Sequence, residues 1–332
     1  MDLSSLTDLE LLKVKIKDLP VDLSAPLVSK GIIQLRRDFQ RKGLSFQPHI
    51  WVSDDWFCPD GVCGFAVPFF ILHPRLIELE KKMMGHCEGE RYGDLLKLLR
   101  HESGHAVDNA YKMRKLEGRV DLFGNHNLPY PKSYEYRPYS KKYVKHIKPH
   151  YAQAHPDEDF AETFAIYLGP KKEWSEHYKN TVALKKLHFI DRELKKVKKL
   201  APLLKGRRRV DPIEKDNRTL GSYYRQKIKQ QRVKEFFFSK RGLPKTLKVQ
   251  KLEGARSTFF SPVEKEIIKM VAKQTNGPQY RVKGMINQLK SSLRQNGVMI
   301  SGSRLELKKQ MVKYLVEHSS SYFKNGEHRV IM

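Results

Sequence analysis

The sequence has few cysteines and no long apolar segment. Its three cysteines, Cys58, Cys63 and Cys87, are too few to form a disulfide framework in a chain of 332 residues. Cys58 and Cys63 also lack two further soft ligands for a zinc site, so buried or reduced thiols are expected. No stretch reaches the roughly 18 to 20 apolar residues of a membrane-spanning helix, and residues 1–20 lack the apolar core of a secretory signal. These absences predict a cytoplasmic protein.

Acidic residues are scarce in the last part of the chain. The formal net charge is +27, of which +7 falls on residues 1–200 and +20 on residues 201–332. A surface this basic attracts nucleic acid, anionic lipid or acidic protein, without choosing between them. This region contains no internal repeat, zinc-finger spacing or RNA-recognition signature, so the sequence does not distinguish between these three kinds of partner.

One short motif, His101-Glu102-Ser103-Gly104-His105, matches the pattern H-E-x-x-H. Residues four apart on an α-helix share one face, so both imidazoles can reach a single metal ion. Glu102 then points into the same cleft, where it can take a proton from a metal-bound water. A pattern with two free positions also arises by chance in unrelated helices, so a third ligand is needed to predict a site.

Apolar residues on both sides of the motif predict a helix that enters the core. Several leucines precede it, and Ala106, Val107 and Ala110 follow it, which suits a helix of about four turns. Gly104 costs such a helix about 1 kcal/mol relative to alanine, so another requirement must favour glycine there. Close packing near a metal ion is one candidate.

A second block, residues 155–165, supplies carboxylates. Glu158 and Glu162 are four apart on a predicted helix. Two histidines and one carboxylate leave the fourth zinc position open, as in catalytic rather than structural sites, and Glu158 is the candidate third ligand. Glu162, one turn later, can accept a hydrogen bond from the far nitrogen of a histidine ligand and fix its tautomer.

Three blocks of the sequence resemble zinc peptidases. A glutamate followed four residues later by a second acid, downstream of H-E-x-x-H, is similar to the gluzincin metallopeptidases. The nearer resemblance is to the bacterial putative zinc-binding metallopeptidases, which carry similar P-F-x-x-x-H-P-R-L, R-H-E-x-G-H and Y-A-Q-x-H-P-x-E-D-F-A-E-T-F-A blocks. Here the blocks lie at residues 68–76, 100–105 and 151–165. The resemblance covers roughly residues 45–200 and implies an α+β, zincin-like domain that binds one Zn²⁺ per chain.

A more distant resemblance is to the catalytic domain of anthrax lethal factor, which has a similar E-F-F-A-E block and a tyrosine seven residues before the liganding glutamate. Tyr151 stands in that position relative to Glu158. By this resemblance its hydroxyl would hydrogen-bond the oxyanion of the tetrahedral intermediate. A half-buried aromatic residue on a loop explains Tyr151 equally well. Glu162 replaces the aspartate of thermolysin-like enzymes, and the segment between His105 and Glu158 is longer than in those enzymes.

The segment between the two metal-binding blocks contains competing histidines. Residues 122–149 hold four prolines and several tyrosines, which predict an ordered but irregular wall of the cleft. The histidines that could compete as ligands are His126, His146, His150 and His155. His155 is the strongest rival, although Pro156 favours an extended backbone there, which turns the ring away from the helical ligand face.

The order of elements predicts three regions in an α+β chain. Residues 1–44 form an N-terminal helical segment, residues 45–200 a catalytic domain with a small sheet, and residues 201–332 a basic, mainly helical C-terminal region. Lysines, arginines, a proline and a glycine over residues 195–209 mark the linker. Strands are expected at residues 45–53 and 65–72, and C-terminal helices at residues 219–238, 262–274, 280–295 and 303–322.

The leading hypothesis is a zinc-dependent hydrolase of peptide or amide bonds. Zinc held by His101, His105 and Glu158 would activate water, and Glu102 would act as general base and then pass the proton to the leaving nitrogen. The alternative is a basic scaffold that binds nucleic acid or protein and carries a structural or inactive zinc domain. In a third hypothesis, the basic region delivers the peptidase to an acidic partner. No motif identifies the substrate.

Overall fold

A computed structural model describes residues 1–232, 248–251, 263–295, 298–301, 303–324 and 330–331. Contacts divide the chain into two compact units, Met1–Ile228 and Lys229–Ile331. Both contain more helix than strand, so the predicted α+β class is confirmed, with helices as the larger part. None of the described helices is long and apolar enough to cross a membrane.

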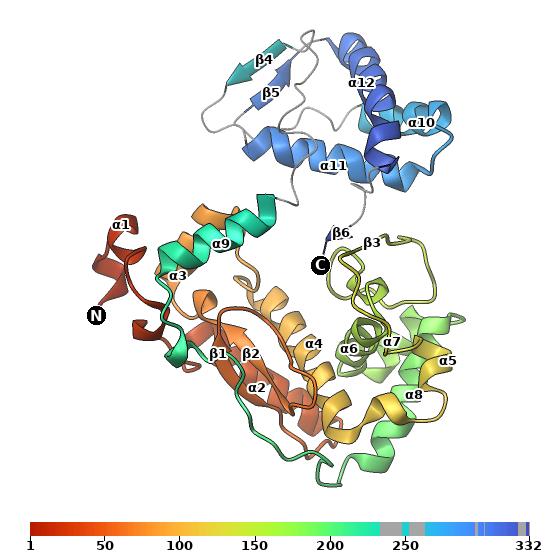
Figure 1. Cartoon of the computed structure of the whole chain (residues 1–332). Coiled ribbons are helices and arrows are strands. Elements are labelled where there is room, and N and C mark those ends of the chain that lie inside the picture. Colours follow the sequence, from red (N-terminus) through yellow and green to blue (C-terminus); the bar gives the residue numbers. More distant parts are fainter. Residues whose placement is uncertain (233–247, 252–262, 296–297, 302, 325–329, 332) are drawn as a thin grey trace. The chain divides into compact units, whose positions relative to one another are not determined.

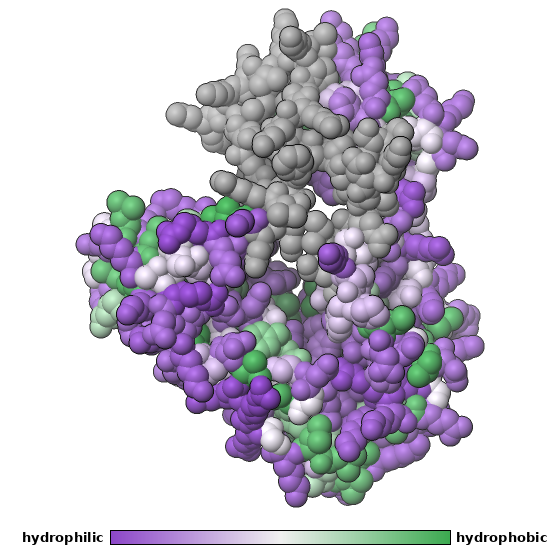
Figure 2. All heavy atoms as spheres, in the orientation of Figure 1, coloured by the Kyte–Doolittle hydropathy of each residue, from purple (hydrophilic) through white to green (hydrophobic). Residues whose placement is uncertain are grey.

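The first unit consists of helices around one small sheet (Figure 1). Its α-helices are α1 (Asp8–Leu11), α2 (Pro26–Arg41), α3 (Pro74–Met84), α4 (Tyr92–Tyr111), α5 (Arg119–Phe123), α6 (Pro156–Tyr167), α7 (Lys171–His177) and α8 (Val182–Val197), followed by α9 (Leu220–Arg232), most of which belongs to this unit. Its strands are β1 (His49–Ser53), β2 (Gly64–Pro68) and the short β3 (Ser133–Tyr134). Among the coloured residues of Figure 2, hydrophilic side chains predominate, with hydrophobic ones scattered between them.

The sheet pairs β1 with β2 in parallel, and Trp51 lies opposite Ala66. Every residue of β2 is buried, because α4 packs against it. The connection between the strands also contacts β2, where the Ala66 amide donates a 2.8 Å hydrogen bond to the Phe57 carbonyl. Burial of this kind is typical of parallel strands, and it explains the continuous apolar run in β2.

The core of the first unit extends from α2 through α4 to α6. The buried residues of α2 include Val28, Ile32, Leu35 and Phe39, which follow each other at helical spacing and therefore share one face. This face packs on α4, and α4 in turn packs on α6. The N-terminal segment predicted as a separate region is thus part of the core of the first unit.

The boundary between the units differs from the predicted one at residue 200. Residues 201–228 pack on the first unit, because their apolar side chains, such as the fully buried Tyr224, enter its core. The Trp51 indole N–H donates a 2.9 Å hydrogen bond to the Val210 carbonyl, and the Ile16 amide donates one of 2.9 Å to the Arg218 carbonyl. Because this segment is rich in basic residues, the sequence did not indicate that these positions are buried.

The second unit has its own apolar core. Its described elements are β4 (Lys248–Lys251), α10 (Glu264–Gln274), α11 (Gln279–Gln295), β5 (Val298–Ser301), α12 (Arg304–Lys324) and β6 (Val330–Ile331). Residues such as Ile267, Val282, Ile286 and Leu315 fill the space between α10, α11 and α12. These helices match the predicted ones within a few residues, whereas the antiparallel β4–β5 pair was not predicted. The predicted helix over residues 219–238 is observed as α9, and Phe236, Phe237 and Phe238 lie outside the described residues.

Candidate metal centre

The H-E-x-x-H motif lies in the middle of α4, on a stretch that is buried all round. His101, Glu102, Gly104 and His105 are all buried, as are the alanines and the valine that follow. The helix ends at Lys112, whose left-handed backbone, with φ of 53°, stops the hydrogen-bond ladder. Because α4 packs against β2, α2 and α6, its polar residues at the motif face other protein groups rather than water.

Gly104 lies at a close approach between α4 and α6. A Cβ atom at Gly104 would lie 2.8 Å from the Cα and 3.0 Å from the carbonyl oxygen of Ala161. Backbone atoms cannot move aside as a flexible side chain can, so only glycine allows this approach. The approach explains the unfavourable glycine in the helix and brings Glu158 and Glu162 of α6 close to the two histidines.

We expect Gly104→Ala to destabilise the protein by about 1 to 3 kcal/mol, because the added methyl group overpacks the contact between α4 and α6. The loss should appear in chemical denaturation of the metal-free protein, although alanine favours helix by about 1 kcal/mol. Gly93→Ala is the matched control in the same helix, since a Cβ there meets nothing within 4 Å. A Gly104→Ala protein as stable as the Gly93→Ala protein would contradict the close approach.

Three potential ligand atoms form a compact triangle. Nε2 of His101 lies 3.2 Å from Nε2 of His105 and 3.0 Å from Oε2 of Glu158, and His105 Nε2 lies 3.4 Å from the same oxygen. Four ligands at about 2.0 to 2.1 Å around tetrahedral zinc are separated by about 3.3 Å. Among the described residues, this is the one group of three or more metal-binding side chains that could hold an ion.

The Glu158 carboxylate provides a test of whether a cation fits. Its Oε2 is buried and accepts no hydrogen bond, although the two histidine nitrogens are close to it. Buried carboxylate oxygens are normally hydrogen-bonded, so an oxygen aimed between two ring nitrogens needs another partner. A divalent cation would satisfy all three atoms at once, and the donor set of two imidazoles and one carboxylate suits zinc.

Glu162 sets the tautomer of His101. The Nδ1–H of His101 donates to Oε1 of Glu162 at 2.9 Å, and Oε2 of Glu162 accepts a 2.8 Å hydrogen bond from the Ile147 amide. Since the neutral ring carries its proton on Nδ1, its Nε2 lone pair faces His105 and Glu158. Both oxygens of the buried Glu162 are therefore used, and this carboxylate cannot turn toward the triangle without losing a bond.

The charges at the centre favour a bound cation. Burial disfavours the imidazolium form of His101, but its contacts with Glu158 and Glu162 outweigh burial and raise its pKa well above the usual value. Burial raises the pKa of Glu158, whereas its contacts with His105 and His101 lower it by more. The pKa of Glu158 therefore lies well below the usual value. In both cases, the protein holds a buried negative charge that needs a positive partner, either a proton or a metal ion.

Glu102 is buried beside the triangle and is not one of its members. Its Oε2 has no hydrogen-bond partner. Burial raises the pKa of Glu102, and the neighbouring Glu158 raises it further, while His101 and His105 lower it. A carboxylate with a raised pKa and a free oxygen is suited to accept a proton.

Tyr151 opens a short 3-10 helix, Tyr151–Gln153, just before α6. Its ring centroid lies 5.5 Å from that of His101. Burial, followed by the charges of Glu158 and Glu102, raises the pKa of Tyr151 far above its usual value, so the hydroxyl keeps its proton. No partner for this hydroxyl occurs among the described residues, which leaves it able to donate to a bound molecule.

Tyr130 is a neighbour of the centre that sequence reasoning did not identify. Its hydroxyl donates a 2.9 Å hydrogen bond to Oε1 of Glu158. Tyr130 comes from the irregular segment between α5 and β3, and it stands between Pro129 and Pro131. Neither helical spacing nor a motif links it to Glu158, so only its position in a proline-rich, aromatic stretch could have indicated a role.

Three of the four rival histidines have other partners. His155 caps α6, because its Nδ1 accepts a 3.2 Å hydrogen bond from the Asp157 amide, and its Nε2–H donates to the Leu128 carbonyl at 2.8 Å. Nε2 of His146 lies 3.1 Å from the Lys97 carbonyl, and His150 stacks on Tyr136. His126 and these three histidines lie outside the metal-binding triangle.

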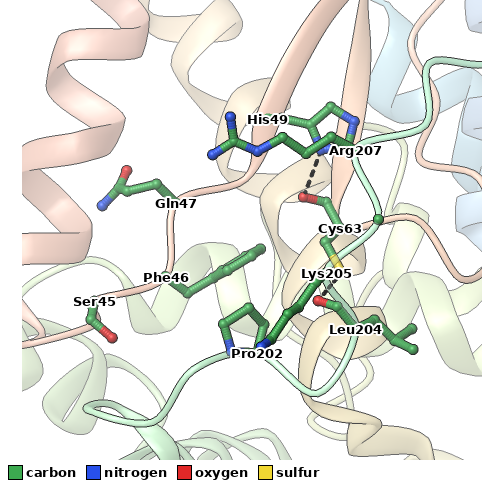
Figure 3. A pocket seen from close by; sticks show the side chains of 10 residues that line it. Ser45, Phe46, Gln47, His49, Cys63, Pro202, Leu204, Lys205 and Arg207 are labelled. Atoms are coloured by element: carbon green, nitrogen blue, oxygen red, sulfur yellow. Dashed lines mark hydrogen bonds between the residues drawn. The ribbon is translucent and has the colours of Figure 1, made fainter.

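A pocket lies elsewhere on the first unit. It has a volume of about 400 Å³ and lies between residues 45–49 and residues 202–207, where the predicted linker crosses the sheet (Figure 3). Phe46, Pro202 and Leu204 contribute apolar side chains to it, and Arg207 extends beside His49 (Figure 3). None of the residues of the metal-binding triangle lines it.

An α+β unit with a buried His-His-Glu triangle and a neighbouring glutamate has the arrangement of a zinc peptidase domain. Residues 78–223 match the model of the family described as "Putative zinc-binding metallo-peptidase". That part of the chain, which contains both metal-binding blocks, is assigned to this family, and the nearer resemblance seen in the sequence is confirmed. No curated protein and no solved structure matches the chain, so the resemblance to anthrax lethal factor stays a prediction.

Proposed function

We propose that this protein is a zinc-dependent metallopeptidase in which His101, His105 and Glu158 hold the metal ion. The observation that carries the proposal is the triangle of ligand atoms 3.0 to 3.4 Å apart, with the partnerless Oε2 of Glu158 at one corner. When bound, zinc would supply Lewis acidity and would lower the pKa of water to about 7. The family match supports a peptide or protein as the substrate.

Glu102 acts as the general base in this proposal. Its free carboxylate oxygen takes a proton from the attacking water and delivers it to the nitrogen of the leaving group as the C–N bond breaks. Burial favours the protonated form of Glu102, which makes its carboxylate a stronger base than one in water. The nearby His101 and His105 lower the pKa of Glu102 and so limit this effect.

Tyr151 donates a hydrogen bond to the developing oxyanion in this proposal. Its hydroxyl stays protonated because burial and two carboxylates raise its pKa, and it has no other partner among the described residues. Glu162 acts indirectly, by holding His101 in the tautomer whose Nε2 lone pair faces the metal-binding triangle. Thus each of the polar groups around the triangle has a separate task.

We expect protein purified without added metal to contain about one zinc per chain and to cleave peptides in a mixed library, with the products identified by mass spectrometry. Removal of the metal with a chelator should abolish cleavage, and stoichiometric zinc should restore it. Cleavage that persists at full rate in the metal-free protein would contradict the proposal. A protein that takes up no zinc would contradict it as well.

We also propose that the basic region, residues 201–332, contacts an acidic protein or nucleic acid. Its net charge of +20 is the observation that favours such a contact. Residues 229–331 form a compact unit with their own apolar core, so basic side chains such as Lys313 remain on its surface. Binding of this kind should weaken steeply as salt is raised.

A further inference from the structure

The two oxygens of Glu158 have different surroundings. Oε2 faces the two histidine nitrogens, whereas Oε1 accepts the hydrogen bond from the Tyr130 hydroxyl at 2.9 Å. Glu158 is only 4% exposed, but Tyr130 is 51% exposed, so this tyrosine reaches from the surface into a buried centre. The carboxylate is therefore held from the side opposite the metal-binding triangle by one exposed residue.

Tyr130 is itself fixed by the beginning of α6. Its ring stacks on the His155 ring, with centroids 3.9 Å apart and planes 16° apart. His155 caps α6 through the Asp157 amide and donates to the Leu128 carbonyl. Residues 128–130 and the first turn of α6, which carries Glu158, are thus connected by a hydrogen bond, a ring stack and a second hydrogen bond.

We propose that Tyr130 is a positioning residue of the metal centre, which holds Oε1 of Glu158 so that Oε2 alone is presented as a ligand. The inference rests on the proposed zinc site and adds a residue that neither the H-E-x-x-H pattern nor the glutamate spacing contains. The terminal torsion of a glutamate is soft and roughly two-fold, so an unheld carboxylate can rotate and exchange its oxygens. The Tyr130 hydroxyl restricts this rotation before metal binds.

The hydroxyl can act as a donor under all ordinary conditions. A tyrosine phenol ordinarily loses its proton only at about pH 10, so the Tyr130 hydroxyl carries its proton at neutral pH and donates a hydrogen bond to the Glu158 carboxylate. A hydrogen bond from a neutral donor to a carboxylate is among the stronger hydrogen bonds in proteins. Partners of this kind, one step removed from the metal, typically change metal affinity by about 10- to 100-fold.

The test is Tyr130→Phe, which removes the hydroxyl and keeps the ring on His155. We expect zinc affinity, measured by competition with a chelating indicator, to fall by about 10-fold or more. We also expect the visible spectrum of the cobalt-substituted protein to change, because a freely rotating carboxylate alters the ligand field. A purely structural role for Tyr130 would not change that spectrum. Tyr139→Phe, at a tyrosine that is 85% exposed in the same segment, is the matched control and should change neither value.

Wild-type zinc affinity together with a wild-type cobalt spectrum in Tyr130→Phe would overturn the positioning role and leave the proposed zinc site intact. Failure of the wild-type protein itself to bind zinc would instead overturn the proposed function. Tyr130→Leu removes the ring as well as the hydroxyl, and it therefore separates an effect on folding from an effect on the metal centre. It should lower the melting temperature of the metal-free protein more than Tyr130→Phe does, because the stack on His155 is lost.

Discussion

Replacing Glu102 with glutamine is expected to lower peptide hydrolysis by about 10²- to 10⁴-fold while zinc binding is retained. The amide has nearly the same shape as the carboxylate but cannot take a proton from water. Because Glu102 is not a corner of the metal-binding triangle, the three ligand atoms should stay in place. The measurements are kcat/KM on a peptide substrate and zinc content by mass spectrometry on the same preparation.

Two further variants serve as comparisons for Glu102→Gln. Glu80→Gln introduces the same chemical change at another buried glutamate, whose carboxylate pairs with Lys227, and it should leave kcat unchanged at a temperature where the protein is folded. Tyr151→Phe removes only the proposed oxyanion donor, so a loss of about 10² to 10³ in kcat is expected. Turnover by Glu102→Gln close to that of the wild type would exclude Glu102 as the general base.

Replacing Glu158 with alanine is expected to weaken zinc binding by about 10²-fold or more. The apparent binding free energy of a protein zinc site, about 10 to 16 kcal/mol, comes from only a few ligands, so the loss of one removes several kcal/mol. The variant also leaves His101 and His105 without the carboxylate that balances a cation. Zinc retained after dialysis against a chelator of known affinity gives the measurement.

The size of the effect distinguishes a ligand from a supporting residue. Glu162→Gln, which affects only the partner of His101, should weaken zinc binding less, by about 10- to 100-fold. Glu173→Ala removes an exposed carboxylate and should have no effect. If Glu158→Ala bound zinc as tightly as Glu173→Ala, Glu158 could not be the third ligand.

Local patterns were sufficient to predict several helices. The helices predicted over residues 262–274, 280–295 and 303–322 correspond to α10, α11 and α12. The spacing of four between His101 and His105, and again between Glu158 and Glu162, places each pair on one face of its helix. Such patterns depend on interactions within one or two turns, so they can be read without knowing the rest of the fold.

The domain boundary could not be predicted in the same way. Residues 201–228 contain many charged residues, and their composition is typical of a linker. A few apolar residues in this segment, among them Leu220 and Tyr224, are nevertheless fully buried against residues far away in the sequence. Composition averages over a segment, whereas burial is decided position by position by the surface on which the segment packs.

The sequence by itself determined the α+β class, the two helices that carry the metal-binding blocks, and the residue types suited to zinc. Only the tertiary structure decided that Glu158 meets His101 and His105, that Gly104 is required by the backbone of Ala161, and that Tyr130 contacts Glu158. The physical reason is that helix periodicity follows from local hydrogen bonding, whereas contacts between distant segments depend on how whole elements pack.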